Sequence, residues 1–291
     1  VLTFFATYFI QNLTVFDTLT SLMLLTVVFA YLQSFSLSSK QISLKSKAQS
    51  LVAAMTVTCI LPFSFWWFVV SPSQANAQSV IAVHAGQMQK RLRAYEKAVT
   101  PNVHGVDLRR SFLAAQTITT IWDQSPEIRQ QGRRFFEQEL FLSETALADT
   151  LGRSSNDLRA YLDLGLLYMT RARYYDSSYY QQAEQITEQA IALNPKNQQA
   201  LWSLVMIYLD QHKTEQAIEF AEQAVALNPF VKKSHELRLV TYLFTEDKDR
   251  IETKIAESLD ILPSLRGTMM DIVSIHNRDR LLIKFYYDLY R

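Results

Sequence analysis

Apolar residues are distributed very unevenly along this chain. Residues 1 to 83 hold only four charged side chains, namely Asp17, Lys40, Lys45 and Lys47. Two segments without charge, at about 18–35 and 50–70, are each long enough to cross a hydrocarbon core of ~30 Å as a helix. The pattern predicts a membrane portion over residues 1–71, in which the apolar start of the chain is the end of an earlier transmembrane helix.

The loop between the two spans predicts the orientation of the chain. Residues 36–47 carry three lysines and no acid, and such loops stay on the cytoplasmic side. We therefore expect a multi-pass protein of the cytoplasmic (inner) membrane, with residues 71–291 on the periplasmic or extracellular side and the lipid bilayer as one partner. Two alternatives stay open: a buried core hairpin, or a signal sequence at 45–78 with a cleavage site near Ala75-Asn76-Ala77.

After Pro72 the apolar positions recur at helical spacing. The pattern predicts helices over 78–99 and 106–122, and a third that starts with Ser125 as its cap and continues to about Leu151, before Gly152. These helices show no clear repeat. We interpret residues 72–155 as a helical adaptor.

The remaining pattern is periodic. Prolines end amphipathic segments at Pro195, Pro229 and Pro263, which are 34 residues apart. The two better copies read AEQITEQAIALNP and AIEFAEQAVALNP, with small alanines where two helices would cross closely. The earlier copy has about six extra residues in a predicted solvent-facing turn at 173–180. This grammar resembles the tetratricopeptide repeat (TPR) family, whose repeats are helix pairs of this length.

The resemblance implies an all-α fold, with transmembrane helices followed by a TPR-like α-solenoid. The predicted repeats cover 156–197, 198–231 and 232–265, and 266–291 would hold a C-terminal helix near 280–290. Members of the family bind proteins or peptides on the concave face lined by first helices. Transferred to this chain, that partner-binding face comprises Arg159, Leu162, Leu166, Gln199, Trp202, Met206, Lys233 and Glu236. For Trp202 and Met206 the alternative is simple burial between helices.

Composition and motifs narrow the possible chemistry. The chain has 29 basic and 28 acidic side chains, so nothing favours nucleic acid as a partner. One cysteine, Cys59, provides no disulfide framework, and the five histidines are scattered without metal-ligand spacing. We find no catalytic motif, and we expect no metal, no cofactor and no catalytic residue. The tyrosines at 174, 175, 179 and 180 suggest either a sticky loop or a turn that packs on itself.

One further motif lies at the start of the chain. AxYFxQNLxVFDxLTS, from Ala6 to Ser21, followed by two predicted spans and external repeats, resembles the C-terminal part of O-antigen ligases and polymerases. That family implies transfer of a glycan from a polyprenyl diphosphate carrier, with functional arginines and a histidine upstream of this segment. Because Val1 lies inside an apolar stretch, we expect the chain to begin partway through such a protein. The alternative is a membrane-anchored TPR scaffold for envelope protein assembly without enzymatic activity.

Overall fold

The structure is a computed structural model, which describes residues 63, 66–100, 105–245 and 247–278. The chain divides into two compact units, Val1–Ser64 and Phe65–Arg291, and every described residue except Phe63 belongs to the second. The predicted span at 18–35, most of the span at 50–70, the Ala6–Ser21 motif and the predicted helix near 280–290 lie outside the described residues. Within the described part, no helix combines the length and the apolar character that a membrane crossing needs.

The described part of the second unit is helical. A short π-helical segment, Trp66–Val70, leads directly into the first α-helix, and a 3₁₀ turn, Pro263–Leu265, precedes the last. The α-helices are α4 (Ser71–His84), α5 (Met88–Val99), α6 (Val106–Asp123), α7 (Pro126–Gln131), α8 (Arg133–Arg153), α9 (Leu158–Tyr174), α10 (Tyr179–Leu193), α11 (Gln198–Asp210), α12 (Thr214–Leu227), α13 (Lys232–Leu243), α14 (Lys248–Ile261) and α15 (Arg266–Arg278).

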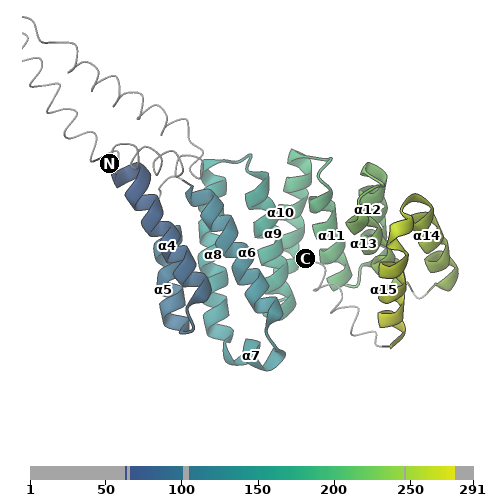
Figure 1. The fold of residues 1–291 in the computed structure, drawn as a ribbon, viewed down its shortest axis with the longest axis horizontal. Helices are drawn as coiled ribbons and strands as arrows, with labels where there is room; N and C mark the ends of the chain where they lie inside the picture. The colour runs from purple at the N-terminus through teal and green to yellow at the C-terminus, as the bar shows by residue number, and fades with distance from the viewer. Residues whose placement is uncertain (1–62, 64–65, 101–104, 246, 279–291) are drawn as a thin grey trace, which may run out of the picture. The chain divides into compact units, whose positions relative to one another are not determined.

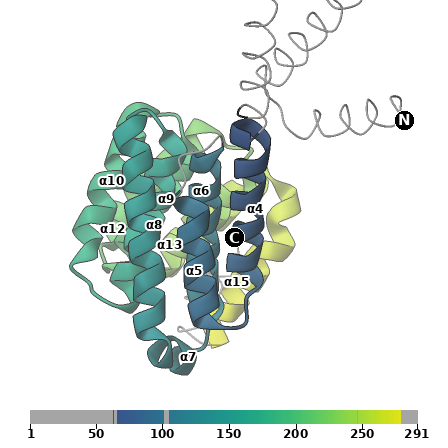
Figure 2. The same ribbon diagram turned by 90° about the vertical axis from the view of Figure 1, so that its left-hand side faces the viewer.

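These helices stack as successive pairs (Figure 1). The pairs are α4 with α5, α6 with α8, α9 with α10, α11 with α12, and α13 with α14. The first helices of neighbouring pairs also touch each other directly, from α4 through α6, α9, α11 and α13 to α15. In the view of Figure 2, α5, α6 and α8, which all contact one another, run side by side. This is the helical-repeat solenoid predicted for the second half of the chain, and the same pairing is seen in the helices that precede it.

One apolar core runs through the stack. Leu140, Leu167, Leu204 and Leu239, from α8, α9, α11 and α13, are each buried to 1% exposure or less and belong to the same cluster. Each pair alone has an apolar face that only the next pair can cover, so burial continues from one repeat to the next.

The helices before the repeats differ from the prediction in two places. The helix predicted for 78–99 is two helices, α4 and α5, because the backbone is extended at Ala85 and at Gln87, on either side of Gly86. The helix predicted from Ser125 begins as expected, with the Ser125 hydroxyl accepting from the backbone N–H of Ile128, but it is interrupted at Gly132.

Close packing explains which glycine interrupts that helix. A Cβ at Gly132 would lie 2.8 Å from the ring of Phe136, whereas one at Gly152 would meet nothing within 4 Å. The helix therefore runs through Gly152 and ends at Arg153, so the predicted stop at Gly152 is wrong.

Two arginines of α6 hold the end of α5. Arg109 Nε donates to the carbonyl of Ala98 at 3.4 Å, and Arg110 Nε donates to the carbonyl of Val99 at 3.1 Å. Carbonyls in the last turn of a helix have no intrahelical partner, and cations are favoured there by the helix dipole. Both arginines are buried and stabilise the stacking of α5 on α6.

The extra residues in the first repeat are not confined to a solvent-facing turn, as the sequence had suggested. They lengthen α9, which ends at Tyr174. Arg173 is buried and paired with Asp210 of α11, with Nε–Oδ2 and Nη2–Oδ1 distances of 2.7 and 2.9 Å. Its guanidinium also lies 5.1 Å from the ring centre of Trp122 in α6. The insertion thus adds a charged contact between neighbouring first helices.

Candidate partner-binding surface

The eight residues predicted to bind a partner occupy equivalent positions on three first helices. Gln199, Trp202 and Met206 follow one face of α11 at i, i+3 and i+7. The same steps fall 40 residues earlier on α9 and 34 residues later on α13. We call this surface the inner face and define it by Arg159, Leu162, Leu166, Gln199, Trp202, Met206, Lys233 and Glu236.

Side-chain caps set the register of two of these helices. Asp157 accepts a hydrogen bond from the backbone N–H of Ala160 at 3.1 Å, and Asn197 accepts one from that of Ala200 at 2.9 Å. Such caps satisfy a free N–H group in the first turn. Because the two caps are 40 residues apart, α9 and α11 begin at equivalent points and present equivalent faces.

A histidine supports the start of α13 instead. His235 Nε2 lies 2.7 Å from the carbonyl oxygen of Pro229, and Nδ1 lies 3.0 Å from Ser258 Oγ in α14. A carbonyl can only accept, so Nε2 carries the proton. Burial, and to a smaller degree Arg238, lower the pKa of His235, while the bond to Pro229 opposes this. Ser258 was predicted to be an atypical residue at an alanine position, and its hydroxyl also accepts from Arg238 Nη2 at 2.7 Å.

A polar hollow lies between α9 and α11. It is lined by Leu158, Arg159, Leu162, Asp163, Asn197 and Gln199. Three of these belong to the predicted set, and Asp163 was missed although it stands one turn after Arg159.

Asp163 gives this hollow its charge. Burial raises the pKa of Asp163 to about 6, although its bond to Ser111 of α6 and the charge of Arg159 act in the opposite direction. Arg159 Nε is 3.8 Å from Asp163 Oδ2, and the Arg159 side chain is 60% exposed. The hollow therefore offers one accessible cation above a half-compensated carboxyl group.

The inner face is more apolar on α11. Trp202 is half-buried, and its Nε1 donates to Ser234 Oγ of α13 at 3.0 Å. Met206 and Leu166 are also half-buried and pack against the main core. Trp202 is thus held in one orientation, with part of its ring accessible between the two helices.

Two positions of the predicted set are buried. Leu162 and Glu236 are each about 5% exposed. Burial raises the pKa of Glu236, while Lys232, whose Nζ is 3.3 Å from Glu236 Oε1, lowers it. Lys233 is half-buried. The inner face is therefore open along α11 and at Arg159, and more closed at α13.

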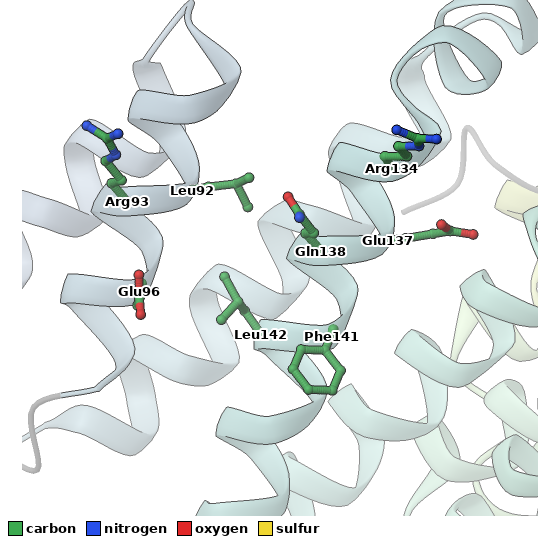
Figure 3. A pocket seen from close by; sticks show the side chains of 8 residues that line it. All are labelled: Leu92, Arg93, Glu96, Arg134, Glu137, Gln138, Phe141 and Leu142. Atoms are coloured by element: carbon green, nitrogen blue, oxygen red, sulfur yellow. The ribbon is translucent and has the colours of Figure 1, made fainter.

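A second hollow, which the sequence did not indicate, lies between α5 and α8. It is lined by Leu92, Arg93, Glu96, Arg134, Glu137, Gln138, Phe141 and Leu142. Figure 3 shows Leu92 and Leu142 pointing into the space between the helices, while Arg93 and Glu137 point away from it. Its rim has two positive and two negative side chains, so it selects no particular charge.

The tyrosines at the end of the first repeat pack within the fold. The Arg129 guanidinium lies 4.4 Å from the ring centre of Tyr174, and that of Arg171 lies 4.2 Å from Tyr179. Tyr179 also stacks on Tyr168, with ring centres 5.8 Å apart. These contacts agree with the interpretation that the turn packs on itself, since cations and a second ring cover the faces that a sticky loop would expose.

Comparisons with known proteins agree with the repeat pattern. The tetratricopeptide repeat family model matches residues 174–237, so the chain contains tetratricopeptide repeats as predicted. Among solved structures, the chain is similar to a thermophilic TPR protein from Thermus thermophilus, with 17% sequence identity and a TM-score of 0.46 over 69% of this chain and 97% of that one. No curated protein matches the chain.

Proposed function

We propose that the chain is a protein-binding scaffold module whose inner face holds a peptide or protein segment of a partner. The observation that supports this most directly is the alignment of Gln199, Trp202 and Met206 on α11 with equivalent positions on α9. Tetratricopeptide repeats generally present such rows to peptides. A partner with apolar side chains fits Trp202 and Met206, and Arg159 adds a polar contact at one end.

Selection of peptides against the full chain tests this proposal. Peptides enriched by display are expected to bind about tenfold more weakly to Met206→Glu, which places a charge on the inner face. Gln189→Glu is a matched control, because Gln189 is exposed on the second helix α10. Equal loss in both variants, or none in Met206→Glu, would exclude the inner face as the binding surface.

We further propose that the module belongs to an O-antigen-ligase-like envelope glycan transferase. Support comes from the motif at Ala6–Ser21 and the charge-free segments that follow it. In this proposal the active site and the lipid-linked glycan lie with the region upstream, and residues 71–291 lie on the periplasmic or extracellular side.

Two measurements test this finer proposal. The gene upstream of Val1 should encode several further spans and a long external loop with arginines and a histidine; a start codon close to Val1 would favour the non-enzymatic scaffold instead. For the topology, Cys59→Ser with Thr145→Cys supplies one exposed thiol in α8. An impermeant maleimide should label it in intact cells, and labelling only after lysis would place the module in the cytoplasm.

A further inference from the structure

The inner face has a candidate occupant within the same chain. Helix α15 packs directly against α13, and residues 279–291, which lie outside the described residues, follow it. We propose that this C-terminal segment binds in cis to the inner face of α11 and α13 and competes with the partner. The inference rests on the proposed function, because it assigns an internal competitor to the same surface.

The reach of the segment suits this surface. Packed helices lie about 8–10 Å apart, so α11, two helices from α15, is roughly 20 Å away. Thirteen residues span about 20 Å as a helix and about 43 Å when extended. The segment can therefore reach α11 in either form, whereas α9, about 30 Å away, requires the extended form.

The chemistry of the segment also suits it. Residues 281–290 read LLIKFYYDLY, in which Leu281, Leu282, Phe285 and Leu289 share one helical face and Lys284 and Asp288 lie on another. On the inner face, Trp202 and Met206 are half-buried, and Phe244 at the end of α13 is 40% exposed. The segment has three basic and two acidic residues, and the inner face has two of each, so no large net charge opposes contact.

Tethering makes even weak contact effective. Short linkers give effective concentrations of about 1 mM, so a segment with a Kd of about 100 µM as a free peptide would weaken an outside ligand about tenfold. This sets the size of the expected effect.

The test uses a fluorescein-labelled peptide of residues 279–291 and fluorescence anisotropy. The peptide should bind a chain that ends at Arg278 and bind the full chain at least tenfold more weakly. Phe285→Asp in the full chain, which leaves the length intact, should restore binding of the added peptide, and Met206→Lys in the shortened chain should abolish it. Equal binding to the full and shortened chains, or binding unaffected by Met206→Lys, would overturn the proposal.

Two further outcomes separate this inference from its alternatives. If the full chain dimerises at micromolar concentration and the shortened chain does not, the segment binds a second copy and the cis arrangement is wrong. If peptides selected by display bind the full and shortened chains equally well, the inner face is a binding surface but has no internal competitor. If only the 279–291 peptide binds there, the internal contact stands and the proposed capture of partners fails.

Discussion

The crossing of α9 and α10 permits a quantitative test of repeat packing. A Cβ added at Gly165 would lie 2.6 Å from Thr187 Oγ1, closer than real contacts allow. Thr187 cannot easily move aside, because it is fully buried and its hydroxyl donates to the carbonyl of Ala183 at 2.7 Å. In the next repeat, the equivalent positions hold Val205 and Ala221, which reverse the large and small partners.

The expected free energies follow from this exchange. Gly165→Val overpacks the crossing at a cost of about 1–3 kcal/mol, and the better helix propensity of valine returns less than about 0.5 kcal/mol. We expect the single variant to lose about 2 kcal/mol of unfolding free energy, and Thr187→Ala alone to lose about 1 kcal/mol or less. Together they recreate the pair of the second repeat, so the double variant should lie within about 1 kcal/mol of wild type, with a coupling energy of about 2 kcal/mol.

Thermal unfolding of the full chain, followed by circular dichroism, measures these differences. For a unit of this size, 1 kcal/mol shifts Tm by about 2–4 °C, so Gly165→Val should lower it by about 4–8 °C. Gly152→Ala is the matched control: a Cβ there meets nothing within 4 Å, and a gain of about 0.4–1 kcal/mol is expected. If the two substitutions at the crossing are simply additive, steric exclusion between Gly165 and Thr187 is not what fixes the glycine.

Three further predictions concern the repeats. Arg173→Met leaves the buried carboxylate of Asp210 without its partner and should cost about 3–5 kcal/mol in urea unfolding, whereas adding Asp210→Leu should recover most of the loss; no recovery would refute the pairing argument. Asn197→Ala removes the cap of α11 and should cost about 1 kcal/mol, measured in the same way, while an unchanged midpoint would deny the cap a role. His235 has its pKa lowered below about 6.5 in the fold, so the unfolded chain binds the extra proton; stability should be complete above pH 6.5 and fall as the pH drops toward the folded-state pKa, and His235→Asn should lose this part of the pH dependence. A pH profile identical to that of wild type would contradict it.

Sequence periodicity predicted the repeats well because each of its marks has a local cause. Pro195 and Pro229 follow helices that end two residues earlier, at Leu193 and Leu227, and Ala183 and Ala190 are fully buried at the crossing. The third repeat was predicted from weaker marks and forms the same helix pair, with polar contacts of Ser258 in place of a close alanine contact.

The sequence did not predict features that depend on distant partners. Gly132 and Gly152 are equivalent in local sequence terms, and only the ring of Phe136 makes one of them interrupt the helix. The partner of Arg173 is 37 residues away, so its burial could not be inferred from the turn in which it stands.

The candidate site shows the same limit. Spacing alone identified equivalent positions on α9, α11 and α13, but exposure at those positions depends on neighbours in space. Glu236 is buried where Gln199 is exposed, and Trp202 is oriented by Ser234, a contact that no single-helix pattern contains. The residues that line the hollow beside Asp163 likewise come from two helices.

The buried pair between Arg173 and Asp210 has a mechanical consequence. The same guanidinium lies over Trp122, whose Nε1 donates to Thr170 Oγ1 at 2.9 Å, so α6, α9 and α11 are joined through one connected group of side chains. Separating any two of these helices would leave a charge without its counter-ion in an apolar setting. A solenoid joined only by apolar contacts can peel apart one repeat at a time under load. Here we expect α6 to α11 to resist pulling as one block and to yield in a single force peak.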